Sequence, residues 1–113
     1  MLILPIKKKW FDMILSGEKK EEYREIKPYY KSRFQNAGML DSFGRVTSSY
    51  GWVIFRNGYS GDSPEIKAKC RLRIKTGRPE WGAEPGKTYY TLMIGTAVRV
   101  SEQPDDSAVD LTK

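Results

Sequence analysis

The sequence predicts an α+β fold that is mainly β: a small, partly open β-barrel of about five strands with two or more short flanking helices. Three observations favour it. Five segments can be assigned as strands, and strands dominate after residue 45. Two shorter segments place apolar residues at helical spacing. The last strand contains Gly95, and a glycine inside a strand is typical of a bulge or a barrel corner.

The N-terminal residues predict a strand followed by a helix. Residues 2–6, LILPI, are apolar and β-prone, and Pro5 favours a place at the edge or end of a sheet. Residues 8–16 form a short amphipathic helix that ends before Gly17. Its apolar positions are Trp10, Phe11, Ile14 and Leu15.

The next stretch, residues 19–26 (KKEEYREI), is almost entirely charged. A continued helix would place four glutamates on its buried stripe, so an extended strand is predicted instead. Glu22 and Arg24 would share one face of that strand. Such a face can turn inward only if the two side chains form a mutually satisfied ion pair that lines a cleft. This pair is the first indication of a site.

The rest of the chain predicts one more helix and three strands. The helix begins with Pro28, which suits a first helical position. In the last strand, Tyr89 and Tyr90 are expected to split, one pointing inward and one outward. These segments are the helix 28–37, the loop 39–49 and the strands 50–55, 65–75 and 89–100.

Length and charge predict one domain with a tail. The chain has 113 residues, 39% of them hydrophobic, which suits a single domain over residues 1–101. Residues 102–113 carry four acidic residues and one lysine, a net charge of −3, and are expected to form a flexible acidic tail. Because the whole chain is +6, the preceding body carries +9. A body this basic favours a polyanionic partner, nucleic acid being the commonest.

The composition also excludes several classes of site. The chain has no histidine and one cysteine, Cys70, so neither a Cys/His zinc site nor a Ser-His-Asp or Cys-His catalytic arrangement can be built. No metal and no cofactor are therefore expected. No apolar run approaches the roughly 18 residues of a membrane span, and the N-terminus does not have the pattern of a signal peptide. A cytoplasmic protein with no membrane partner is expected.

The strand 65–75 has the clearest pattern in the chain, because every second residue is basic. Same-side residues lie about 6.8 Å apart along a strand. Such a row can act as an electrostatic rail for a single-stranded nucleic acid backbone. Equally, exposed lysines can serve only to keep a strand soluble and to block edge pairing. The row comprises Lys67, Lys69, Arg71, Arg73 and Lys75.

Two further features have a functional and a structural interpretation. Lys7 lies at the start of the first helix, where positive charge opposes the helix dipole unless an anion binds there. An ordinary surface lysine is the structural alternative. Trp81 lies in a turn-rich loop, where its ring can stack on a base or cap the open end of the barrel.

The segment ILSGEKKEEYR contains Gly17, Lys19, Glu22 and Arg24 in the pattern G-x-K-x-x-E-x-R. This pattern resembles the signature of the ASCH domain, a relative of the PUA RNA-binding fold. The resemblance extends over residues 1–100. The segments LPIKKKWFDMILSGEK, FRNGY, EWGAEPGKTYY and YYTLMIGTAVRV are similar to those of small phage and bacterial members.

The resemblance implies a small β-barrel whose signature residues line a cleft for RNA or a nucleotide. In this interpretation Lys19 is the cleft cation, and Glu22 and Arg24 form the ion pair. Lys7 matches a lysine of the family's opening segment, although the proline that usually follows it is absent here. Arg56 belongs to the matching FRNGY segment.

Some small bacterial members are amidohydrolases that act on N4-acetylcytidine. Lys19 matches their motif lysine, but Glu22 stands where they have a catalytic threonine. A carboxylate does not replace a hydroxyl of that kind, and their third catalytic residue, a glutamate, is not placed here, although Glu80 and Glu84 are candidates. Ribonuclease activity is attributed to other members, and a lysine with Tyr23 can do such chemistry without histidine.

We therefore expect an RNA- or nucleotide-binding protein that holds a nucleotide in the cleft. The alternative is an enzyme acting on RNA or a modified nucleoside, with Lys19 and Glu22 as catalytic residues. Contact of the basic strand with an acidic protein surface is a third interpretation, and the oligomeric state stays open. The expected nucleic-acid-binding residues are Lys7, Lys19, Tyr23, Arg24, Arg56, Lys67, Lys69, Arg71, Arg73 and Trp81.

Overall fold

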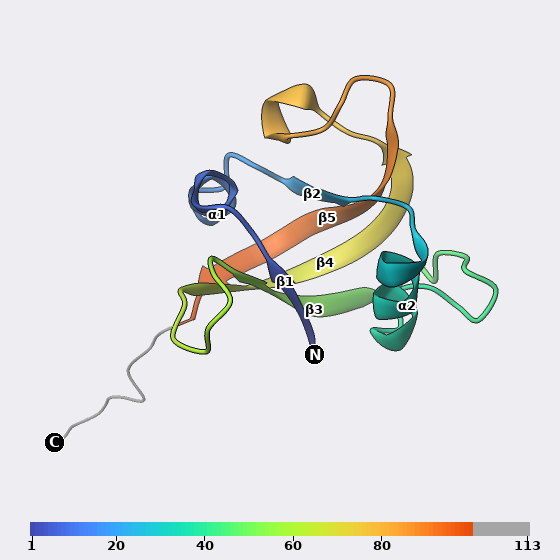
Figure 1. Cartoon of the computed structure of the whole chain (residues 1–113), viewed down its shortest axis with the longest axis horizontal. Coiled ribbons are helices and arrows are strands. Elements are labelled where there is room, and N and C mark those ends of the chain that lie inside the picture. Colours follow the sequence, from blue (N-terminus) through green and yellow to red (C-terminus); the bar gives the residue numbers. More distant parts are fainter. Residues whose placement is uncertain (101–113) are drawn as a thin grey trace, which may run out of the picture.

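The computed structural model describes residues 1–100, in which a strongly curled five-stranded sheet is flanked by two α-helices (Figure 1). The predicted α+β, mainly β fold is confirmed. The expected acidic tail, residues 102–113, lies outside the described residues. The elements are β1 (Leu2–Pro5), α1 (Lys8–Leu15), β2 (Glu21–Arg24), α2 (Pro28–Asn36), β3 (Tyr50–Arg56), β4 (Glu65–Thr76), the 3-10 helix η1 (Pro79–Trp81) and β5 (Thr88–Arg99).

The strand order is β1-β3-β4-β5-β2, so the two shortest strands form the two edges of the sheet. β1 pairs with β3 in parallel, and the other pairs are antiparallel. The edge position expected for the first strand is confirmed. The register between β4 and β5 shifts after Ala68, so that two residues of β5, Gly95 and Thr96, lie opposite Lys69 alone. This is the bulge that the interior glycine predicted.

The core fills the concave side of the curled sheet. Alternate residues of β3, β4 and β5 point into it, and Phe11 and Ile14 of α1 and Phe34 of α2 complete it. Phe34 packs edge-to-face on Tyr90, with 5.2 Å between ring centroids. None of the helices within residues 1–100 has the length and apolar character needed to cross a membrane.

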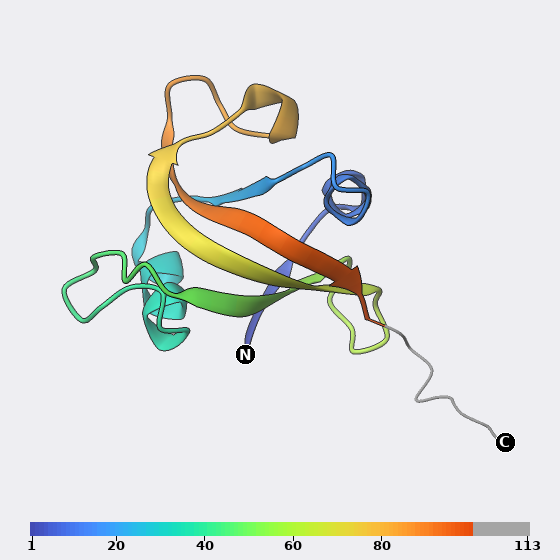
Figure 2. The ribbon, with the colours of Figure 1, turned by 180° about the vertical axis from the view of Figure 1, so that it is seen from behind.

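The loop between β4 and β5, which carries η1, folds back toward β2 (Figures 1 and 2). It packs on Tyr23 and Tyr89, which lie on the opposite face of the sheet from the core. Tyr89 lies beneath this loop, where its hydroxyl accepts a hydrogen bond from the backbone N–H of Glu84 at 3.1 Å. Tyr89 and Tyr90 therefore point to opposite faces, as predicted, but both are buried. The predicted split is therefore confirmed, and the outward-pointing Tyr89 is nevertheless buried because the loop folds back over its own strand.

Candidate functional site

A cleft opens where the two edge strands of the sheet approach each other. Its volume is about 310 Å³. The end of β1 and the start of α1 line one side, β2 lines the other, and residues at the start of α2 also contribute. Nine of the lining residues bring charge or an aromatic ring to the cleft: Lys7, Trp10, Glu22, Tyr23, Arg24, Glu25, Lys27, Tyr30 and Tyr89.

Arg24 bridges the two edges of the sheet. One guanidinium nitrogen, Nη2, donates to the backbone carbonyl of Pro5 on β1 at 2.9 Å and to Oε2 of Glu22 at 2.7 Å. Edge strands have unpaired carbonyls, and a charged donor can satisfy them. The Arg24 guanidinium also lies 5.8 Å from the ring centroid of Tyr30. The side chain therefore ties β2 to both β1 and α2.

Glu22 lies between two cations. Its Oε2 accepts from Arg24, and its Oε1 lies 3.2 Å from Nζ of Lys19. Glu22 pairs with Leu92 in the β2–β5 register, so its side chain is on the core face of the sheet, and it is only 7% exposed. The ion pair that the strand pattern required is confirmed, and it lines a cleft.

Lys19 is buried against protein groups. Its side chain is fully buried, and its ammonium lies over the rings of Trp10 and Tyr23 at 4.9 and 4.8 Å. It also donates a short hydrogen bond of 2.5 Å to the backbone carbonyl of Trp81. Desolvation by burial lowers the pKa of Lys19, and the carboxylate of Glu22 partly offsets the effect. Lys19 thus forms a buried ion pair with the cleft residue Glu22 and does not line the cleft itself.

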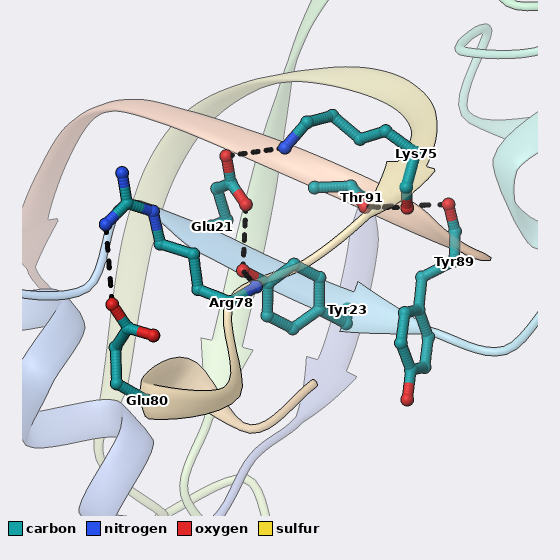
Figure 3. A network of polar contacts seen from close by, with 7 residues as sticks. All are labelled: Glu21, Tyr23, Lys75, Arg78, Glu80, Tyr89 and Thr91. Atoms are coloured by element: carbon teal, nitrogen blue, oxygen red, sulfur yellow. Dashed lines mark hydrogen bonds and ion pairs between the residues drawn. The ribbon is translucent and has the colours of Figure 1, made fainter. Parts of the chain in front are cut away.

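A second polar network holds the η1 loop against β2 (Figure 3). Tyr23 donates to Oε1 of Glu21 at 2.8 Å and accepts from the backbone N–H of Arg78 at 2.9 Å, while Lys75 donates to Oε2 of Glu21 at 2.9 Å. Burial raises the pKa of Tyr23, and its hydrogen bond to Glu21 adds to the rise. Burial also opposes ionisation of Glu21, but the bonds from Lys75 and Tyr23 outweigh it and lower the pKa of the carboxyl. This network holds in place the loop that carries the Trp81 carbonyl.

Two helix starts bring further cations to the cleft. Lys7 is the N-cap residue of α1 and makes no side-chain cap, and the first turn contains no acidic residue. Lys27 occupies the same position before α2, 5.5 Å from the ring centroid of Tyr30. Lys7 was predicted from the sequence as a site residue, whereas Lys27, Tyr30 and Trp10 were not. Pro28, which follows Lys27, marks a helix start in the sequence. Nothing in the local sequence pattern shows that this helix start lies across the cleft from α1.

Other predicted site residues lie away from the cleft. Arg56 is paired with Glu65 across β3 and β4, with 2.6 Å between Nη2 and Oε2. The side chain of Trp81 contacts Arg78 and is not part of the cleft wall. The basic row of β4 lies on the opposite face of the sheet from Glu22, because Leu72 and not Arg71 shares the Glu22–Leu92 face. The structure therefore separates the predicted residues into a cleft and an outer face.

The comparisons with known proteins found no relative of this chain. No protein-family model, no curated protein and no solved structure matches it. The resemblance to the ASCH domain accordingly stays a prediction that rests on the motif residues. Within residues 1–100, no group of three or more His, Cys, Asp or Glu side chains is placed to hold a metal ion.

Proposed function

We propose that the cleft binds one nucleotide unit of RNA. The observation that carries this proposal is the combination of lysines and aromatic faces around a buried arginine–carboxylate pair. Phosphate and base need these two kinds of group: phosphate is bound by Lys, Arg and helix N-termini, and bases stack on aromatic rings. The net charge of +6 favours a polyanion and adds long-range attraction to it.

The phosphate would lie at the start of α1. The first N–H groups of a helix lack intrahelical partners and carry partial positive charge. No side chain caps this end, and Lys7 extends the positive charge toward the cleft. Lys27 would meet the same phosphate from the start of α2, although it also lies 3.5 Å from Glu25. Two lysines on different elements would then recognise one anion.

The base would lie against the rings of Tyr30 and Trp10. Glu22 offers a buried acceptor: each of its carboxylate oxygens already receives one donor, and each keeps a further acceptor position. That position can take a hydrogen from the amino group of a base such as cytosine. Arg24, which is fixed by Glu22 and Pro5, would donate to a base carbonyl.

Lys19 acts in this proposal as a positioning residue. Its lowered pKa is the observation that favours the alternative, an enzyme acting on RNA or a modified cytidine with Lys19 as general base. Against that role, the ammonium faces Glu22 and the Trp81 carbonyl, and its side chain has no exposed surface. We therefore propose binding rather than turnover, in the reducing cytoplasm that suits the free, buried Cys70.

Calorimetric titration with cytidine and uridine monophosphates tests the proposal. Lys27→Ala and Tyr30→Ala should each weaken binding about 5- to 10-fold, because each removes one ligand contact and leaves the hydrogen bonds of the Glu22–Arg24 pair in place. Lys31→Ala and Phe43→Ala are the matched controls, since both side chains are exposed and lie outside the cleft. Equal affinity in all variants would refute binding in this cleft. Loss of acetyl from N4-acetylcytidine, or cleavage of RNA, in a Lys19-dependent manner would establish the enzyme instead.

A further inference from the structure

The outer face of the sheet carries a group of aromatic and basic side chains that the cleft does not use. Tyr50 and Trp52 lie on β3, and Lys67, Lys69 and Arg71 lie on β4. We call these five residues the outer platform. Tyr50 is the register partner of Arg71, and Trp52 is the partner of Lys69, so all point to one side. Figure 2 views the sheet from this side, with β1 behind it.

The two rings of the outer platform are accessible, and they lie on the part of β3 that precedes its pairing with β1. Tyr50 is 56% exposed and Trp52 is 43% exposed. The next residues along β3, Gly51 and Val53, point the other way, and Val53 is fully buried in the core. Two exposed aromatic rings side by side on one strand face form a patch of the kind that marks an interaction site.

The rings and the cations of the outer platform are interleaved. The ammonium of Lys67 lies 4.9 Å from the Trp52 ring centroid, and the guanidinium of Arg71 lies 5.5 Å from that of Tyr50. Lys69 lies 5.8 Å from the same tyrosine ring. Each ring therefore has at least one positive charge beside it, and the Cα atoms of the two aromatic residues are about 6.8 Å apart along the strand.

The charge of the outer platform is not compensated by neighbouring carboxylates. Among the residues that the structure describes, none of its three cations lies within ion-pair distance of an acidic side chain. Within residues 1–100, the ion pairs of this face lie toward its two ends, where Arg56 meets Glu65 and Lys75 meets Glu21. The positive charge between them is therefore available to an external anion.

We propose that the outer platform is a second nucleic-acid site, which binds single-stranded RNA by stacking and by phosphate contacts. Bases would stack on Trp52 and Tyr50, and Lys67, Lys69 and Arg71 would contact the phosphates between them. Stacking of this kind tolerates any base sequence, since every base has an aromatic face. Paired bases cannot stack in this way, so single-stranded RNA is preferred over a duplex. The site lies on the opposite face of the sheet from the cleft and does not depend on the function proposed for it.

Fluorescence anisotropy with a labelled 12-residue oligouridine tests this site. Tyr50→Ala/Trp52→Ala should weaken binding at least 10-fold, whereas Trp52→Phe should keep most of the affinity because it keeps an aromatic face. Lys69→Ala/Arg71→Ala should lower the slope of log affinity against log salt by about 1.4, or about 0.7 for each lost phosphate contact. The controls are Phe43→Ala/Tyr59→Ala, which removes two exposed rings elsewhere, and Lys31→Ala, which removes one exposed lysine.

Three results would overturn the proposal. The first is wild-type affinity for oligouridine after loss of both rings. The second is equal loss in Trp52→Phe and Trp52→Ala, which would indicate a structural role of the tryptophan. The third is that polyglutamate or a 12-base-pair RNA duplex also binds, and that loss of the two rings weakens this binding as much as it weakens binding of oligouridine.

The cleft and the outer platform can be tested separately. Uridine monophosphate is too short to span two rings, so its affinity should respond to Lys27→Ala and not to Tyr50→Ala/Trp52→Ala. If only the ring variants weaken oligouridine binding and the cleft variants change nothing, the outer platform stands and the cleft proposal fails. If only the cleft variants weaken binding, the cleft proposal stands and the outer-platform proposal fails. Thermal unfolding of each variant identifies any loss that arises from misfolding.

Discussion

Replacing Glu22 by glutamine removes the carboxylate that lies between Lys19 and Arg24 while keeping the size of the side chain. The two N···O separations are 3.2 and 2.7 Å. At an effective dielectric constant of about 20, each corresponds to an attraction of about 5–6 kcal/mol, most of which offsets the desolvation of the charges. Without the carboxylate, two cations remain buried next to each other with no counter-charge.

The expected cost follows from this burial. The side chains of Lys19, Glu22 and Arg24 are 0%, 9% and 10% exposed, so little discount for solvent is needed. Removing one partner of a buried ion pair lowers the free energy of unfolding by about 3–5 kcal/mol. The glutamine oxygen can still accept one hydrogen bond, so we expect about 3 kcal/mol. At about 4 °C per kcal/mol for a domain of this size, the unfolding midpoint should fall by about 12 °C.

Thermal unfolding followed by circular dichroism measures this shift. Adding Lys19→Met to Glu22→Gln should restore part of the loss, about 1–3 kcal/mol, because it removes one of the unpaired cations and keeps an apolar stem. Glu25→Gln is the matched control: its carboxylate is exposed and pairs with Lys87 and Lys27 at the surface, so its midpoint should stay close to the wild-type value. A Glu22→Gln midpoint within about 3 °C of wild type would refute the view that this carboxylate holds the two cations in place.

Two further predictions concern Cys70 in the core and Gly77 beside Tyr23. Burial raises the pKa of the Cys70 thiol from 9.0 to about 12, so the unfolded state loses this proton first as the pH rises. From this group alone, the unfolding free energy should fall by about 2–3 kcal/mol between pH 8 and pH 11. Denaturant titrations of Cys70→Ala should lack that part of the fall. A Cβ at Gly77 would lie 2.8 Å from that of Ala83 and closer still to the Tyr23 ring. Gly77→Ala should therefore cost about 1–3 kcal/mol and lower the pKa of Tyr23 by opening its surroundings, which ultraviolet titration of the phenol measures. An unchanged alkaline slope in Cys70→Ala, or an unchanged tyrosine titration in Gly77→Ala, would contradict the respective argument.

The two helices and most strands could be predicted from the sequence to within a residue or two, whereas β2 is four residues shorter than the predicted strand 19–26 and η1 was not predicted. The expected helix 8–16 is α1 at Lys8–Leu15, and the expected strand 65–75 is β4 at Glu65–Thr76. These elements have strong helical or two-residue periodicity, and Gly17 and Pro28 mark a helix end and a helix start. The position of β1 at an edge followed from Pro5, because proline cannot donate to a neighbouring strand.

Part of the candidate site was also predictable. Glu22 and Arg24 lie two residues apart in a strand, so they share a face whatever the surroundings, and a buried face must pair its charges. The same alternation placed Lys69 and Arg71 together on β4. It could not show that Tyr50 and Trp52 lie beside them, since the register of β3 against β4 is a property of the folded sheet.

The sequence by itself determined the elements, their apolar faces and the pairing of Glu22 with Arg24, because these depend on contacts between residues close along the chain. Only the tertiary structure decided that Lys19 is buried against the carbonyl of Trp81, 62 residues away, and that the cleft and the basic strand lie on opposite faces. It also brought Lys27 to the cleft. Such contacts depend on how the sheet curls and where the η1 loop folds back, and no local periodicity encodes either.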